Sequence, residues 1–336
     1  MKIYIPDYYK EFQCIAGQCK DNCCIGWDIM IDEKSYERYQ KVTTDFKDRL
    51  NQGIQHGKEP QFNMDEQNRC VFLNKDNLCD IYIELGESAL CEICTQHPRF
   101  HNEYGHIKQS GLGIACEEAA RLIIERSDFS IMEENKESDN EEIDEWAEEI
   151  MNMEIKLFDL LEERECPIED RINKVFDMTA AYQEELNRTG ELDVQSENIC
   201  IVPHNILKKM KQKDYLEYWF DFYEELDYMN EEFKTLIHRA KKDLNLKSEC
   251  HTNDIYIERL MNYFIYRHFI KSYEDDNFLD KIKFAILSVL IIQHIDQFCQ
   301  NHEIPYGFID IARMYSKEIE YSQENMESIY EELLFE

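Results

Sequence analysis

The sequence FLDKIKFAILSVLIIQHIDQF, residues 278–298, is rich in apolar side chains that recur at intervals of three and four residues. This spacing is typical of an α-helix whose apolar face is buried. The side chains expected on the buried face are Ile282, Phe284, Ile286, Leu287, Leu290, Ile291 and Ile295. We therefore predict that this segment is the central core helix of a helical array.

The segments around this helix continue the same pattern, and after residue 113 the chain has only two glycines, Gly190 and Gly307. We predict helices at residues 144–165, 169–188, 214–246, 252–274, 278–301, 307–320 and 323–334, with Ser322 capping the last one. The predicted fold is mainly α and not Rossmann-like, because a Rossmann domain needs alternating strands and helices. Gly111-Leu-Gly113 is also no dinucleotide fingerprint, since Cys116 stands in place of the third glycine.

The first 126 residues differ in character, because they hold eight of the ten glycines and nine of the 13 cysteines. They contain short apolar stretches, a possible strand at 106–109 and a helix-like segment at 117–126. Core burial alone stabilises such a chain poorly, and metal ligation is the usual substitute. We predict a cysteine-rich, loop-rich domain at 1–126, an acidic linker at 127–143 (SDFSIMEENKESDNEEI) and an all-helical domain at 144–336.

The net charge of −34 argues against nucleic acid or an anionic membrane as the main partner, because both attract Lys and Arg. Residues 1–126 hold 21 acidic and 15 basic side chains, a net charge of −6, which leaves −28 for the rest. The acidic helical part could dock a lysine-bearing protein or simply keep the chain in solution. No apolar run approaches the roughly 20 residues that span a bilayer, nor does the N-terminus resemble a signal peptide, so we expect a cytoplasmic protein.

Clustered cysteines in a reducing compartment are more often metal ligands than disulfides. Cys14, Cys19, Cys23 and Cys24 form a Cys-x4-Cys-x3-Cys-Cys pattern within 11 residues. Adjacent cysteines point in different directions, so we expect one of Cys23 and Cys24 either to serve a different centre or to pack in the core. The pattern also starts like the radical S-adenosylmethionine motif, but Gly26 stands where its third cysteine belongs.

A second set of cysteines follows, namely Cys70, Cys79, Cys91, Cys94 and Cys116. Zinc and iron compete for the same thiolates. Because the chain lacks two matching Cys-x2–4-Cys knuckles, we favour an iron–sulfur cluster, with zinc as the alternative. The remaining cysteines, Cys166, Cys200, Cys250 and Cys299, are expected to pack as small apolar side chains.

Three runs of sequence resemble the flagellin lysine-N-methylase family, which is related to a broader set of cysteine-rich zinc- or iron-chelating proteins. The runs are FQCIAGQCKDNCCIGWDIMIDEKSYERY (12–39), CVFLNKDNLCDIYIELGESALCEICTQHPRF (70–100) and CEEAARLIIE (116–125). The resemblance covers about the first 126 residues, and the helical remainder matches in general character and length only. Two positions depart from the family pattern: His97 replaces a more common Tyr, and Glu117 replaces a frequent Pro.

The resemblance implies an enzyme that transfers methyl groups from S-adenosylmethionine to surface lysines of flagellin. It also implies an iron–sulfur cluster, expected to be of the 4Fe–4S type. The family's cysteines fall on Cys14, Cys19, Cys23, Cys24, Cys70, Cys79, Cys94 and Cys116, whereas Cys91 looks like an addition.

Two arginines and four proton acceptors are candidates for further site residues. Arg99 and Arg121 could bind the carboxylate of the methionine moiety, although Arg121 could equally pair with Glu117 or Glu125. The candidate bases are Asp28, Asp32, Tyr36 and Glu118, each of which could instead lie on a solvated face or make a structural hydrogen bond.

Two other functions remain open from the sequence. The chain could be a non-catalytic zinc- or iron-binding module fused to a helical partner-binding domain. It could also be a redox sensor that uses the thiol pair Cys91 and Cys94.

Overall fold

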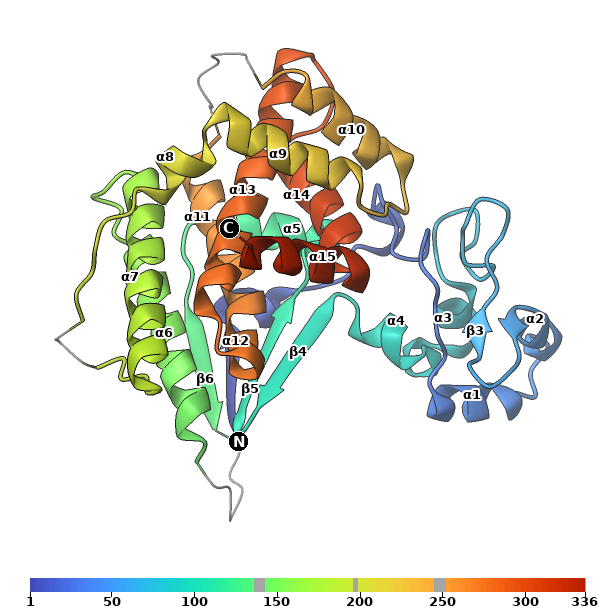
Figure 1. Cartoon of the computed structure of the whole chain (residues 1–336). Coiled ribbons are helices and arrows are strands. Elements are labelled where there is room, and N and C mark those ends of the chain that lie inside the picture. The colour runs from blue at the N-terminus through green and yellow to red at the C-terminus, as the bar shows by residue number, and fades with distance from the viewer. Residues whose placement is uncertain (136–142, 196–198, 245–251, 336) are drawn as a thin grey trace.

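The computed structural model describes residues 1–135, 143–195, 199–244 and 252–335. Its centre is helix α13 (Phe278–Asn301), whose side chains are buried on almost every side. Helices α7, α10, α11, α14 and α15 all pack against it (Figure 1). The predicted central core helix is therefore confirmed, and its enclosure explains why its apolar residues cover more than one face.

The helices of the C-terminal part follow the prediction closely. They are α6 (Glu145–Leu161), α7 (Ile168–Thr189), α8 (Ile206–Met210), α9 (Lys213–Glu224), α10 (Glu231–Lys241), α11 (Asp254–His268), α12 (Ser272–Asp275), α13, α14 (Phe308–Tyr315) and α15 (Gln323–Leu334). Ser322 caps α15 as predicted, with its side chain accepting a hydrogen bond from the backbone N–H of Asn325.

Three details of the helical prediction are wrong. The segment predicted at 214–246, of which residues 245 and 246 lie outside the described residues, contains two helices, α9 and α10, because the side chain of Asn230 caps a new helix by accepting from the N–H of Glu232. No Gly or Pro marks this break. The short helix α8 was not predicted. The segment 307–320 ends in a π-helical turn, Ser316–Glu320, rather than in regular α-helix.

A small sheet lies beside the helices, with strand order β4-β5-β1-β6. Its strands are β1 (Lys2–Pro6), β4 (Arg99–Tyr104), β5 (Ile107–Leu112) and β6 (Ile131–Asn135). The first strand pairs in parallel with β5 and antiparallel with β6. Part of the predicted linker 127–143 is therefore a strand of this sheet, while residues 136–142 lie outside the described residues.

The predicted N-terminal domain begins with β1, a strand of this sheet, and ends with helix α5 (Glu117–Ile124). Both of these ends lie with the helices of the C-terminal part. Helix α5 packs on α11 and α14, and Tyr8 and Phe12 belong to the same core as α13. We call residues 1–12 and 99–335 the helical body. The mainly helical fold without a Rossmann arrangement agrees with the prediction. The predicted division at residue 126 does not match this packing.

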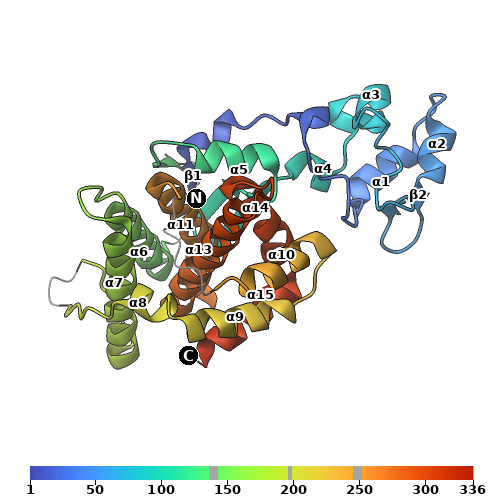
Figure 2. The ribbon, with the colours of Figure 1, turned by 90° about the horizontal axis from the view of Figure 1, so that it is seen from above.

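Residues 13–98 form a separate unit, which we call the cysteine-rich module (Figures 1 and 2). It contains α1 (Glu33–Gln40), α2 (Lys47–Gln52), β2 (Ile54–Gln55), β3 (Gln61–Phe62), α3 (Asp80–Leu85) and α4 (Glu92–Gln96). The module has its own small hydrophobic core, which includes Phe62, Phe72, Cys70 and Cys91. Figure 1 shows it to one side of the helical body, with α4 lying between β4 and the rest of the module.

No described helix is both long enough and apolar enough to cross a membrane.

Candidate functional site

The nine cysteines up to Cys116 lie in two groups. The first group, the module thiols, consists of the five cysteines that pack in or against the core of the module: Cys24, Cys70, Cys79, Cys91 and Cys94. The backbone N–H of Cys70 donates to the carbonyl of Cys24 at 2.8 Å. The Sγ atoms of Cys91 and Cys94 are 3.4 Å apart. Cys91, which the sequence comparison left out of the ligand set, thus contacts a predicted ligand.

The second group, the junction thiols, consists of Cys14, Cys19, Cys23 and Cys116 and lies where the module meets the body. Burial, together with the charges of Cys116, Glu117, Cys14 and Cys23, raises the pKa of Cys19 to about 12. A backbone contact joins the same two segments, because the N–H of Lys20 donates to Glu117 Oε2 at 2.7 Å. Three of these thiols come from the module and Cys116 comes from the start of α5 in the body.

The two groups meet at the adjacent residues Cys23 and Cys24. A hydrogen bond with Cys24 lowers the pKa of Cys23, whereas the pKa of Cys24 is raised by the same bond and by burial. The charges of Cys70 and Cys79 also raise the pKa of Cys24. The sequence left open that one of these two cysteines serves a different centre or packs in the core, and Cys24 packs against the core of the module.

All nine cysteines are free thiols. As they stand, no three His, Cys, Asp or Glu side chains of the described residues are placed to hold a metal ion. The thiols of either group would therefore have to turn toward a common point to bind one. The donor set itself suits a metal, because four thiolates are what a 4Fe–4S cluster or a structural zinc ion requires.

An ion-pair cluster fastens residues 14–28 of the module, which we call the cysteine loop, to the body. Asp21, which lies between Cys19 and Cys23, pairs with Arg313 of α14 and with Lys317 of the π-helical turn, the latter at 3.1 Å. The ammonium group of Lys317 also lies 5.6 Å from the ring centre of Trp27. Trp27 in turn packs edge-on against Tyr321, with ring centres 5.3 Å apart.

Behind Tyr321, the body holds a buried polar network. The guanidinium of Arg267 lies 4.7 Å from the ring centre of Tyr321 and pairs with Glu320 at 3.2 Å. Glu320 also accepts a hydrogen bond from Tyr263 at 2.9 Å and lies 2.7 Å from His268 Nε2. Although burial raises the pKa of Glu320, Arg267 and His268 outweigh burial and lower it to about 2.

Gly113 is needed where this network meets the segment that leads to Cys116. A Cβ atom at Gly113 would lie 2.2 Å from the hydroxyl of Tyr321 and 2.7 Å from Arg267 Nη1. The backbone N–H of Gly113 donates to the carbonyl of Pro98 at 2.7 Å, which ties this segment to the end of the module. A side chain at this position would therefore force Tyr321 and Arg267 to move.

His97 contributes an unusual group to the junction. Its Nε2 atom is buried and has no hydrogen-bond partner among the described residues. Burial, together with the positive charges of Lys317 and Arg267, lowers the pKa of His97 to about 4. The sequence comparison noted His97 only as a departure from the family pattern, and its position before Pro98 gave no sign of these contacts.

The two arginines predicted to bind the cofactor have other partners. Arg99 lies over the rings of Tyr9 and Phe12, at 5.8 and 5.4 Å. Arg121 is half exposed and pairs with Glu118 and Glu125, so one of its two predicted partners, Glu125, is found.

Three of the candidate bases also have structural partners. Asp32 caps α1 and accepts from the N–H of Glu92 at 2.8 Å. Tyr36 bonds to His56 at 2.8 Å, and Glu118 is paired with Arg121. The fourth candidate, Asp28, is exposed.

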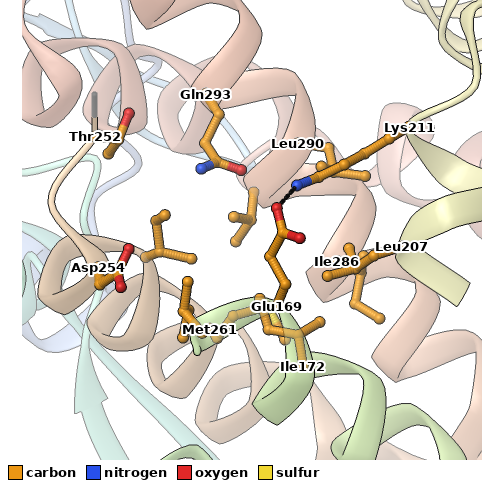
Figure 3. Close-up of a pocket in the computed structure, with 13 residues that line it drawn as sticks. Glu169, Ile172, Leu207, Lys211, Thr252, Asp254, Met261, Ile286, Leu290 and Gln293 are labelled. Carbon is orange, nitrogen blue, oxygen red and sulfur yellow. Dashed lines mark hydrogen bonds and ion pairs between the residues drawn. The ribbon is translucent and has the colours of Figure 1, made fainter. Parts of the chain in front are cut away.

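Two hollows lie elsewhere in the body. A cavity of about 110 Å³ between α7, α8, α11 and α13 has walls of mixed polar and apolar side chains, with the ion pair of Glu169 and Lys211 at one side (Figure 3). Ligand pockets measure roughly 300–1,000 Å³, so this cavity is too small for S-adenosylmethionine. A second, open hollow of about 380 Å³ lies beside α10 and Tyr306. Neither is lined by a junction thiol.

Comparisons with known proteins identify the family. The family model described as the FliB lysine N-methylase C-terminal domain matches residues 112–336, which include all of the part where the motifs had shown only a general likeness. Over 137 residues, 38% of this chain, the sequence is 28% identical to the lysine-N-methylases of Salmonella typhimurium and Salmonella choleraesuis. The match covers 34% of each of those proteins.

A further relative is the flagellar biosynthetic protein FliU of Salmonella muenchen. It is 28% identical over 139 residues, which make up 39% of this chain and 82% of FliU. No solved structure matches the chain. The family model covers about two thirds of the sequence and agrees with the resemblance of the cysteine motifs, so the chain belongs to the flagellin lysine-N-methylase family.

Proposed function

We propose that this protein transfers a methyl group from S-adenosylmethionine to the Nζ atom of lysine side chains on flagellin. In this reaction a bond forms between Nζ and the methyl carbon, the bond from that carbon to sulfur breaks, and the sulfonium becomes a thioether. The amine must be neutral when it attacks, so a proton leaves it beforehand. The observation that carries the proposal is the family match over the helical body.

We further propose that Cys14, Cys19, Cys23 and Cys116 hold an iron–sulfur cluster of the 4Fe–4S type. Support comes from their number and chemistry and from their common position at the junction. When bound, such a cluster would carry a cysteine thiolate on each of its four irons, so it would tie the cysteine loop to the start of α5 and would leave no open iron for S-adenosylmethionine. Nothing in the radical motif supports radical chemistry, because Gly26 replaces the third cysteine of that motif.

The residues around the junction suit a neutral amine. His97 stays neutral at physiological pH, so its Nε2 can accept a hydrogen bond from the amine and orient the nitrogen lone pair. The net charge of −28 after residue 126 would attract a lysine-bearing substrate.

The test is to incubate the anaerobically purified full chain with flagellin and S-adenosylmethionine that carries an isotopically labelled methyl group. Mass spectrometry should then find labelled methyl groups on flagellin lysines. We expect Cys14→Ser to lose this activity together with the iron, and the exposed Cys200→Ser to keep both. Unlabelled flagellin, with the iron–sulfur cluster shown spectroscopically to be intact, would refute the proposed methyl transfer.

A further inference from the structure

The module thiols are an assembly separate from the junction thiols, and the proposed function gives them no role. Five thiols lie in or against one small hydrophobic core, drawn from segments up to 70 residues apart in sequence. Cys70 and Cys91 are almost completely buried, at 5% and 0% exposure. Free cysteines are common in cores, but five around a core of this size are far more than packing needs.

The contacts within the module bring together thiols from four segments of the chain. Cys24 and Cys70 are joined by their backbone hydrogen bond, and Cys79 lies at the start of α3 opposite Leu73. Cys91 and Cys94 stand at the start of α4. The charges of Cys91, Cys24 and Cys79 all act on Cys94, which places these thiols near one another.

The spacing of Cys91 and Cys94 favours a single metal ion over a cluster. Two thiolates bound to one tetrahedral zinc at about 2.3 Å lie about 3.8 Å from each other. The observed distance between the two Sγ atoms is 3.4 Å, so a small adjustment reaches that value. In a 4Fe–4S cluster each cysteine binds a different iron, which holds the sulfurs farther apart.

We propose that four of the five module thiols, Cys24 and Cys79 among them, bind one zinc ion that stabilises the cysteine-rich module, separately from the cluster site at the junction. Zinc fits because the module has a small core, and small domains of this kind often depend on a structural metal. The side chains would turn toward a common point as the ion binds. The adjacent residues Cys23 and Cys24 then belong to different sites, which explains why the sequence places two cysteines side by side.

The experiment measures zinc and iron in the same anaerobically purified full chain by elemental analysis. Wild type should contain about one zinc ion per chain in addition to iron. We expect Cys79→Ser to bind zinc about tenfold or more weakly while iron is retained, and Cys14→Ser to lose iron while zinc is retained. Cys200→Ser, in the exposed part of the body, serves as the control that keeps both metals.

Two further measurements keep the test decisive if a variant does not fold. X-ray absorption at the zinc edge of the wild-type chain should show only sulfur neighbours, at about 2.3 Å. Removal of zinc from wild type should expose the module to protease without loss of structure in the helical body.

The proposal is overturned if wild type binds no zinc, if its zinc has nitrogen or oxygen neighbours, or if the module thiols hold iron. It is also overturned if Cys79→Ser and Cys14→Ser each lose both metals, which would indicate one shared centre. Zinc content is measured without a methylation assay. A chain that binds zinc but does not methylate flagellin would therefore refute the proposed function alone.

Discussion

Asp21 should control how firmly the cysteine loop is held against the helical body. Its carboxylate is the shared partner of Arg313 and Lys317, whose side chains are only 9% and 12% exposed. Breaking a buried ion pair costs about 3–5 kcal/mol and breaking a surface pair about 0–1 kcal/mol. Since Asp21 itself is 28% exposed, we expect Asp21→Asn, which keeps the shape and removes the charge, to cost about 2 kcal/mol. This corresponds to about a 30-fold change in the docking equilibrium.

Hydrogen exchange of the metal-free full chain measures this equilibrium directly. Amides of residues 19–27 should exchange up to about 30-fold faster in Asp21→Asn, whereas those of α13 should be unchanged. The matched control is Asp28→Asn, which removes an exposed acidic charge from the same loop. Equal exchange in Asp21→Asn, Asp28→Asn and wild type would refute the reasoning that this ion pair positions the junction thiols.

Three other changes test the packing, titration and charge of the molecule. Gly113→Ala should lower the free energy of unfolding by about 1–3 kcal/mol in thermal denaturation, because its Cβ would press on Tyr321, while Gly57→Ala, with open space around it, should not. His97 and His268 both have pKa values lowered to about 4, so their contribution to stability is complete above about pH 6.5 and is lost as the pH falls toward 4. Urea denaturation should therefore show a steep loss of stability between these pH values, and His97→Gln should flatten that loss. Rising salt should raise the KM for flagellin more than it lowers kcat if the acidic surface attracts the substrate; salt-independent kinetics would argue that the charge serves only solubility.

The helices were predictable because each depends on its own residues and their spacing. Helix α13 and helix α15, with its Ser322 cap, could be placed at their observed ends. The break between α9 and α10 could not, since only Asn230 marks it and Asn is common in ordinary loops and helices. Helix α8 has only five residues, too few for a clear period.

The candidate site was less predictable, because it depends on contacts between distant segments. Counting cysteines predicted a thiol-rich site, but the sequence spacing could not show that Cys23 lies with Cys116 while Cys24 lies with Cys79. Arg121 was equally ambiguous, since a helical arginine can pair within its own helix, as it does here with Glu118. The contacts of His97 and Asp21 come from elements about 170 to 300 residues away.

The match to the family model begins inside the sheet, at the last residue of β5. The matched residues 112–336 contain only one junction thiol, Cys116, and lack β1, which forms the sheet strand between β5 and β6. The body therefore needs the first residues of the chain to complete its sheet. It also needs the cysteine loop to complete the set of four thiols. A cluster at the junction would thus bind only when the loop is docked, so its binding energy would add to the docking that Asp21 provides. Binding of the cluster should slow hydrogen exchange in residues 19–27 and in the first turn of α5 together, and slowing in only one of these segments would contradict a shared site.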